Sequence, residues 1–242
     1  MVVRISDKTQ NYSKVTKLLV KPKKYYLEKN DYQLLLLRIK YFLDKDRNAM
    51  NGKYTISSIY FDDEFNTSWC DSENGNPVRD KYRIRIYNNN LDLIKLEIKR
   101  KVYSYAKKIS ANITYDDLQL ILSGKTIDNP HNNEAIKLFN MQISFANMKP
   151  VVIVTYDRVP FVCDEGNVRI TFDYNLRASV DFDCFGNNCY EMYPLFDQPV
   201  LEVKYDQYLP DTIAQLLEIN SMTETNNSKF KICRELIEEN NL

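Results

Sequence analysis

The sequence has few of the residues on which the commonest nucleotide and metal sites depend. Its 242 residues include only 5 Gly, and neither G-x-G-x-x-G nor G-x-x-x-x-G-K occurs, which argues against a dinucleotide loop and a P-loop. The single histidine, His131, follows Pro130 in an expected loop, so most histidine-based zinc sites are excluded. A Ser–His or Cys–His arrangement is a remote option, well behind a solvated loop histidine.

Long apolar runs and an excess of charge are also missing. No N-terminal segment is apolar enough for a signal peptide or a membrane span, so we expect no direct membrane span. The 33 Lys and Arg residues balance the 33 Asp and Glu residues, whereas a general nucleic-acid binder usually carries a basic excess. We therefore expect no nucleic acid among the partners.

The cysteines are an odd number without close pairs, 5 in all. Cys184 and Cys189 have the wrong spacing for a C-x-x-C site, and no second pair completes one. This usage indicates a reducing compartment, and a cytoplasmic location is the default expectation.

What the sequence does contain indicates one globular domain. Hydrophobic residues make up 44% and charged residues 27%, which is typical of a folded soluble chain. There is no internal repeat, linker or low-complexity tract. We divide the chain into an N-terminal extension over residues 1–17 and a single domain over residues 18–242.

Residue patterns predict an α+β fold dominated by antiparallel strands. Strands are expected over residues 17–27, 54–62, 80–87, 91–101, 103–110, 151–160, 168–174, 178–185 and 200–205. Helices are expected from the cap Asn30 to Leu43, from the cap Thr114 to Gly124, and over residues 133–147, 212–219 and 229–239. The polar segment 63–78 includes a short helix carrying Trp69, and residues 186–197 are an expected loop. Pro22 implies that the first strand lies at an edge or carries a bulge.

The most informative pattern is a set of strands in which every second residue is charged. Lys81, Arg83 and Arg85 fall on one face of a strand, and Tyr82, Ile84 and Ile86 fall on the other. The same alternation gives three further charged faces, formed by Glu97 with Lys99, by Arg169 with Thr171 and Asp173, and by Glu202 with Lys204.

These charged faces have two interpretations. The first is a sheet covered on one side, whose polar face meets water, and periodicity alone favours it. The second is a barrel with a polar lumen, in which alternate residues point inward. Lys81, Arg83 and Arg85 crowd cations that repel one another unless an anion lies among them. Such a lumen suits a polyphosphate, because Arg binds phosphate oxygens bidentately and carboxylates can hold Mg²⁺ or Mn²⁺.

An ordered series of segments resembles the VTC domain, the polyphosphate polymerase domain of the triphosphate tunnel metalloenzymes, which is related to the CYTH group. The resemblance covers roughly residues 20–235. The segments are Lys24-Tyr25 and residues 58–62, 81–85, 96–99, 156–158, 169–173, 201–205 and 228–230. It implies an antiparallel eight-stranded β-barrel tunnel with flanking helices. It also implies a polymerase that transfers the γ-phosphate of ATP onto a polyphosphate chain and releases ADP, with Mn²⁺ or Mg²⁺ as cofactor.

The resemblance also assigns roles to individual residues. The expected catalytic residues are Lys24, Arg83, Arg85, Lys99, Arg158 and Lys229. Further phosphate-binding residues are Lys81, Lys108, Arg169 and Lys204. Glu202 matches the family's metal-binding glutamate, and Glu97 is a second candidate for the metal. The sequence departs from the family at Phe230, where a tyrosine is usual, and at Pro22, where bacterial relatives usually carry an acidic residue.

Two other functions stay open at this point. The same tunnel in other relatives hydrolyses tripolyphosphate or an organic triphosphate, because tunnel chemistry alone does not separate transfer to phosphate from transfer to water. A non-catalytic module that binds polyphosphate or a nucleotide is the third possibility, and the loss of the acid at Pro22 favours it slightly. For all three, ATP or a polyphosphate is the expected partner.

Overall fold

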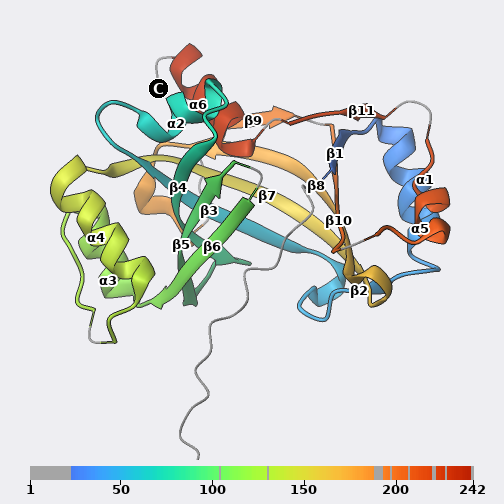
Figure 1. Cartoon of the computed structure of the whole chain (residues 1–242), viewed down its shortest axis with the longest axis horizontal. Helices are drawn as coiled ribbons and strands as arrows, with labels where there is room; N and C mark the ends of the chain where they lie inside the picture. Colours follow the sequence, from blue (N-terminus) through green and yellow to red (C-terminus); the bar gives the residue numbers. More distant parts are fainter. Residues whose placement is uncertain are drawn as a thin grey trace, which may run out of the picture.

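The computed structural model describes residues 23–103, 105–129, 131–187, 193–196, 198–206, 208–219, 222–226 and 228–240. The expected extension over residues 1–17 and the departure at Pro22 lie outside this part of the chain. The described residues form an α+β fold, in which helices flank one antiparallel sheet of eleven strands (Figure 1).

The strands of the sheet are joined in the order β11-β1-β10-β8-β7-β3-β4-β5-β6, with β2 paired to β7 and β9 paired to β8. Their bounds are β1 (Lys23–Tyr26), β2 (Asp44–Lys45), β3 (Tyr54–Asp62), β4 (Val78–Tyr87), β5 (Asn90–Val102), β6 (Tyr105–Ile113), β7 (Lys149–Cys163), β8 (Val168–Ser179), β9 (Tyr193–Phe196), β10 (Val200–Lys204) and β11 (Thr223–Glu224).

The structure confirms the expected fold class and corrects two details, the number of strands and the closure of the barrel. The path from β1 to β6 contains eight strands, and the short strands β2, β9 and β11 add to them. Within the described residues, no hydrogen-bonded ladder joins the two ends of this path, so the sheet is not a closed barrel. A curved sheet can still enclose a lumen when its two ends face each other without pairing.

The helices lie in three groups around the sheet (Figure 1). α3 and α4 cover one side, α1 and α5 the opposite side, and α2 and α6 lie together between them. Their bounds are α1 (Lys29–Ile39), α2 (Thr67–Glu73), α3 (Tyr115–Leu122), α4 (Glu134–Ala146), α5 (Asp211–Leu216) and α6 (Lys229–Glu239).

The helix groups α1 with α5 and α3 with α4 pack on one face of the sheet, and α6 packs on the other. Ile84 on β4 and Leu96 on β5 pack with Phe139 of α4, and all three are fully buried. Phe172 on β8 packs with Leu35 of α1 in a second hydrophobic cluster. The third cluster joins α6 to β3 and β7 on the other face of the sheet. The helix α6 therefore packs against the face that α1, α3, α4 and α5 leave uncovered.

The helices α3 and α4 begin at the expected residues. The Thr114 side chain accepts a hydrogen bond from the Asp117 backbone N–H, and the Asp117 carboxylate accepts one from the Thr114 N–H, which forms a capping box at α3. Asn133 caps α4 in the same way through the Ala135 N–H. At α1 the expectation is wrong, because the helix begins after Glu28 rather than at Asn30 and ends at Ile39.

Two segments after β7 also differ from the expectation. Residues 178 and 179 end strand β8, and the rest of the expected strand over residues 178–185 includes a short 3₁₀ turn over Phe182–Cys184. The expected loop over residues 186–197 contains the strand β9. Neither segment carries a clear alternating pattern, and β9 forms a strand through its pairing with β8.

Two findings bear on the expected compartment. Cys184 is disulfide-bonded, whereas Cys70, Cys163 and Cys233 are free thiols, so the expectation of reduced cysteines is wrong at Cys184. In the part of the chain that the structure describes, no helix is both long and apolar enough to cross a bilayer. The cellular location itself stays a prediction.

Candidate functional site

The charged strand faces gather on the side of the sheet away from the two outer clusters. On β4, Ile84 belongs to the outer cluster with α4, whereas Arg83 contacts Glu97 on β5 and Arg85 contacts Ser58 on β3. Successive residues of a strand point to opposite faces, so Lys81, Arg83 and Arg85 share the inner face as the alternation predicts. On this strand, the charged residues therefore do not form a solvated outer face.

Strands that are not paired face each other across this inner side. Burial among the surrounding walls, followed by the charges of Lys24 on β1 and Arg83 on β4, lowers the pKa of Lys99 on β5 to about 8. The charge of Lys204 on β10 also contributes to this decrease, and the charge of Glu202 opposes it. Because β1 and β10 lie at one end of the strand path and β5 near the other, the sheet curls and encloses a charged lumen.

One wall of the lumen holds a buried carboxylate between two cations. Arg83 donates two hydrogen bonds to Glu97 Oε2 at 2.8 and 2.6 Å, and Lys108 donates to Glu97 Oε1 at 2.9 Å. Burial raises the pKa of Glu97, but Arg83, Arg85 and Lys108 outweigh it and lower that pKa to about 2. Both oxygens of Glu97 are engaged, which favours an ion-pair role over metal binding.

Beyond Glu97 the same wall consists of cations placed opposite one another. Lys99 lies opposite both Lys81 and Lys108, and Arg79 lies opposite Lys101. Burial comes first among the causes that lower the pKa of Lys81 to about 8, and Lys99 adds to it. Like charges directly opposite each other destabilise a sheet. A bound anion would offset this repulsion, so the arrangement is suited to an anionic ligand.

Arg79 and Lys101 were not among the predicted site residues, although a signal for Arg79 exists. It lies two residues before Lys81 and so continues the alternation of cations by one step. Lys101 has the same relation to Lys99. Their cross-strand pairing lengthens the basic row beyond the predicted set.

The opposite wall is organised around Asp173, a buried residue of β8. Arg158 on β7 donates to both of its oxygens at 2.6 and 2.7 Å, and Lys229 of α6 contacts Oδ2 at 2.6 Å. Burial opposes ionisation of Asp173, but Lys229 and Arg158 hold its pKa well below the usual range. The bidentate contact fixes the Arg158 guanidinium in one orientation.

Glu202 on β10 lies next to this group. Lys204 contacts its carboxylate at 3.1 Å and Arg158 at 3.7 Å, and Lys24 on β1 lies opposite it. Burial raises the pKa of Glu202, but Lys204, Lys24 and Arg158 lower it to about 2. The predicted residues Lys24, Arg158, Glu202 and Lys204 are therefore brought together.

Arg169 has different partners from the other predicted cations. Its guanidinium contacts Asp46 at 2.7 Å and donates to the Tyr54 hydroxyl at 3.1 Å. Sequence reasoning missed Asp46, because the residue follows the two-residue strand β2 and has no alternating pattern. Arg169 lies opposite Lys204 in the sheet. It therefore borders the same wall, at the end that is farther from Lys229.

The helix α6 delivers Lys229 into the lumen. The Ser228 hydroxyl caps the helix through the Lys231 N–H and also accepts a hydrogen bond from Lys81 Nζ, each at 3.1 Å. Phe230 stacks on Tyr60 of β3 with ring centroids 4.8 Å apart. These contacts tie the first turn of α6 to β4 and β3 at once.

Aromatic rings line the wall beneath these cations. Lys229 Nζ lies 4.6 Å from the centre of the Tyr156 ring, and the Arg158 guanidinium lies 5.4 Å from the same ring. Arg83 donates to the Tyr60 hydroxyl at 3.2 Å. Sequence reasoning treated the tyrosines as strand core, and the signal it passed over is the spacing of Tyr156 two residues before Arg158.

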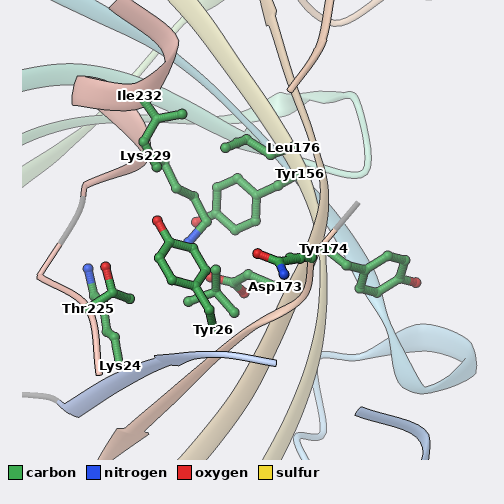
Figure 2. Close-up of a pocket in the computed structure, with 11 residues that line it drawn as sticks. Lys24, Tyr26, Tyr156, Asp173, Tyr174, Leu176, Thr225, Lys229 and Ile232 are labelled. Atoms are coloured by element: carbon green, nitrogen blue, oxygen red, sulfur yellow. The ribbon is translucent and has the colours of Figure 1, made fainter. Parts of the chain in front are cut away.

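A pocket opens beside this group. Figure 2 shows Lys229 extending from α6 toward Asp173, with Tyr156 and Tyr26 beside it and Tyr174 directed away. The pocket lies between β1, β8 and α6, and Lys24 also lines it. Of the predicted site residues, Lys24 and Lys229 line this pocket, whereas Arg83 and Arg85 do not.

Of the three carboxylates of the lumen, Glu202 is the one that could hold a metal together with a phosphate. Within the described ranges, no three Asp, Glu, His or Cys side chains converge as a metal site. Asp173 and Glu97 are held by cations at 2.6 to 2.9 Å, and Glu202 by the longer contacts of 3.1 and 3.7 Å. Mg²⁺ is commonly bound by one or two carboxylates together with water and phosphate oxygens. Glu202 therefore suits a metal completed by a bound phosphate.

Comparisons with known proteins agree with this architecture. The model of the VTC domain family matches residues 20–237. No curated protein sequence matches the chain. A Bacillus halodurans structure named for an adenylate cyclase superposes with a TM-score of 0.51 at 10% identity, covering 83% of this chain and 86% of that one.

A second solved structure is similar over most of both chains. It is a Hippeastrum protein named for an adenylyl cyclase and described with a dominant triphosphatase activity. The TM-score is 0.53 at 15% identity, covering 88% of this chain and 93% of that one. At these identities the two structures show a shared fold.

Proposed function

Because the chain belongs to the VTC domain family, we propose that it is a metal-dependent polyphosphate polymerase. In this proposal it transfers the γ-phosphate of ATP onto the end of a polyphosphate chain and releases ADP. The acids, the cations and the tunnel support the binding of phosphate groups that this function requires. The choice of phosphate as acceptor is the part that an experiment must test.

The observation that carries the proposal is the row of cations that lie opposite one another on neighbouring strands. Lys81, Lys99 and Lys108 lie side by side on three neighbouring strands, and Arg79 with Lys101 continues the row. Their mutual repulsion is relieved by a ligand that carries negative charge at regular intervals along its length. A linear polyphosphate has this property, and Arg and Lys are the side chains that bind phosphate oxygens.

The chemistry that these residues support is displacement at phosphorus. A terminal oxygen of the polyphosphate chain forms a new bond to the γ-phosphorus of ATP. The bond from that phosphorus to the β–γ bridging oxygen breaks, and ADP leaves with the electron pair. Phosphoryl transfer of this kind depends on positioning and charge neutralisation rather than on a nucleophilic side chain.

In this proposal the arginines and lysines of the lumen bind and orient the phosphates. Arg158 is held by Asp173, so its charge is already in place when the substrate arrives. Lys229 brings a further charge to the same position from α6. A divalent cation bound beside Glu202 would neutralise charge on the phosphate oxygens.

A second candidate function is hydrolysis of a triphosphate, with water in place of the polyphosphate acceptor. The Hippeastrum protein described with a dominant triphosphatase activity has the same fold, which supports this alternative. In that case the lumen binds the triphosphate in the same way, and water forms the new bond to phosphorus. The residues that bind phosphate do not separate the two reactions.

The decisive experiment incubates the purified chain with ATP and Mn²⁺, and in parallel with Mg²⁺. Formation of long chains on a polyacrylamide gel, with one ADP released per phosphate added, is the expected result. Release of free phosphate without chains would establish hydrolysis instead. Tight binding of polyphosphate without turnover in any divalent metal would establish a binding module.

A further inference from the structure

Thr171 lies in the lumen between two residues with defined contacts. It occupies the middle of the β8 face that carries Arg169 and Asp173, and its cross-strand neighbours are Glu202 on β10 and Pro160 on β7. The flanking residues Ile170 and Phe172 point to the opposite face and pack against α1. The Thr171 side chain is therefore directed into the lumen beside Glu202.

The hydroxyl of Thr171 is buried without a hydrogen-bond partner. The residue is 2% exposed, and its Oγ1 is the only hydroxyl among the buried, unpaired side-chain atoms of the described residues. Other buried hydroxyls of the sheet are paired, since Ser57 contacts Thr155 at 2.9 Å and Ser58 accepts from Arg85 at 3.0 Å. Burial of an unpaired hydroxyl is unfavourable, so such a group calls for an explanation.

The polar contacts of the residues around Thr171 go to other groups. Pro160 on one side has no backbone N–H and an apolar side chain. On the other side, Lys204 and Arg158 both contact Oε2 of Glu202. Asp173, two residues along the strand, is held by Arg158 and Lys229. A ligand in the lumen is the partner that this position leaves.

We propose that Thr171 is a further substrate-binding residue, whose Oγ1 donates a hydrogen bond to a phosphoryl oxygen of the bound triphosphate. The proposal rests on the proposed phosphate-binding function of the lumen. A hydroxyl that donates to a charged phosphoryl oxygen forms a charge-assisted bond, which is about twice as strong as a neutral one. The bond would hold the phosphate beside Glu202, at the position where Arg158 and Lys204 already meet.

The test replaces Thr171 with valine, which keeps the shape of the side chain and removes the hydroxyl. We expect Thr171→Val to weaken tripolyphosphate binding about 10-fold or more, as measured by calorimetry in EDTA, because a hydrogen bond to a charged group contributes about 1.5–3 kcal/mol. Thr171→Ser should keep affinity within about 3-fold. The Tm of the ligand-free Thr171→Val protein should not fall, because the lost hydroxyl has no protein partner.

Thr155→Val is the matched control. It also removes a buried hydroxyl from a strand, but one that is paired to Ser57. We expect it to lower the Tm and to leave tripolyphosphate affinity unchanged, which is the reverse of the result for Thr171→Val. If Thr171→Val does not fold, the comparison of Thr171→Ser with Thr171→Ala provides the same readout.

The outcomes separate this proposal from the proposed function. Unchanged affinity of Thr171→Val in EDTA would overturn the role of the hydroxyl, and so would a loss of affinity seen only with metal present. A wild-type protein that binds tripolyphosphate but forms no chains would overturn the polymerase proposal and leave the hydroxyl assignment intact. A wild-type protein that binds no tripolyphosphate would overturn both.

Discussion

The three buried carboxylates of the lumen differ in the number and length of their contacts with cations. Glu97 and Asp173 each accept three hydrogen bonds from two cations at 2.9 Å or less. Glu202 is held by longer contacts to Lys204 and Arg158. At the scale of the residue, this difference separates carboxylates that fix arginines from the one that suits a metal.

Replacement of Glu202 by Gln should abolish turnover and preserve binding. The neutral amide removes the charge that a divalent cation needs, and we expect kcat to fall about 100-fold or more, as losses of transition-state electrostatic stabilisation do. Tripolyphosphate affinity in EDTA should stay the same or increase, because one negative charge leaves a basic lumen. The measurements are ADP release with Mn²⁺ and calorimetry in EDTA.

Asp80→Asn is the control for this change. Asp80 is also a strand carboxylate held by an arginine, Arg100, at 2.6 Å, but it lies on the outer face with Tyr82. It should leave both turnover and affinity close to those of the wild type. Full activity of the Glu202→Gln protein would rule out a metal role for this residue.

The lysines of the lumen predict a dependence on pH. Burial, and next the neighbouring charges, lower the pKa of Lys81 and of Lys99 from 10.5 to about 8. Tripolyphosphate affinity should therefore decrease as the pH rises from 7 to 9, although the ligand itself becomes more negative. Calorimetry in two buffers of different ionisation enthalpy should show proton uptake on binding above pH 8.

The same lysines affect the stability of the ligand-free protein in the opposite direction. Between pH 8 and 10.5 the unfolded chain holds more protons on Lys81 and Lys99 than the folded chain does. Their contribution to the free energy of unfolding therefore increases with pH across this window. A double Lys81→Met and Lys99→Met variant should lose both effects, and an unchanged pH profile in that variant would contradict the assignment.

At the scale of the element, α6 connects the packing of the fold to the chemistry of the lumen. Phe230 and Cys233 bury its apolar side against β3 and β7, and Lys229 projects from its first turn onto Asp173. The sequence predicts this helix with its observed bounds, residues 229–239. It does not predict that the helix packs on the inner face, because an apolar stripe fits any apolar surface.

Replacement of Lys229 by Met should affect both stability and activity. The change removes one of the two cations that hold the buried Asp173 and leaves Arg158 as the other. Loss of one member of a buried ion pair costs about 3–5 kcal/mol. Turnover should also fall about 100-fold, because one charge that meets the phosphates is lost. Urea unfolding and ADP release measure the two effects.

Lys231→Met provides the comparison on the same helix. Lys231 pairs with Glu73 and Glu235 outside the lumen, and such partly exposed surface pairs contribute about 0–1 kcal/mol. Its stability and turnover should remain near those of the wild type. Equal losses in the two variants would show that α6 acts only as a packing element.

The strands show which features the alternation of residues predicts and which it does not. It places Lys81, Arg83 and Arg85 on one face, and the packing of Ile84 and Ile86 in the outer cluster confirms it. It does not place β9, because that short segment forms a strand only through its pairing with β8. Helix α1 ends at Ile39, earlier than expected, because the apolar spacing continues into a turn whose Leu43 still packs in the core.

At the scale of the whole molecule, the curled sheet should bind longer phosphate chains better than short ones. The row of cations runs past Lys81 and Lys99 to Arg79 and Lys101. At a concentration of 100 times Kd, a ligand stabilises the folded chain by about 2.7 kcal/mol. For a domain of this size that corresponds to an increase in Tm of roughly 5–10 °C.

The comparison of chain lengths isolates this effect. Polyphosphate of many units should raise the Tm at lower concentrations than tripolyphosphate does, and Arg79→Ala should reduce that advantage while leaving tripolyphosphate binding nearly unchanged. Sodium chloride at matched ionic strength is the control for screening. Equal affinity for both chain lengths would indicate a site limited to three phosphates and would favour the triphosphatase alternative.

The sequence by itself determined most of the strands, which side chains share a face of each strand, and most of the residues that meet in the lumen, because side-chain direction alternates along a strand whatever the tertiary structure. Its ordered segments also indicated the VTC domain family, to which the chain belongs. Local patterns carry this information because each depends on residues only a few positions apart.

Only the tertiary structure decided which charges pair and which remain opposed. The register places Arg83 opposite Glu97 but Lys81 opposite Lys99, and the curl of the sheet brings Lys24 near both walls. It also leaves the Thr171 hydroxyl beside Glu202 without a partner. These relations depend on strand register, strand order and curvature, which bring together residues as distant in the sequence as Lys24 and Glu202, and no local pattern encodes such pairings.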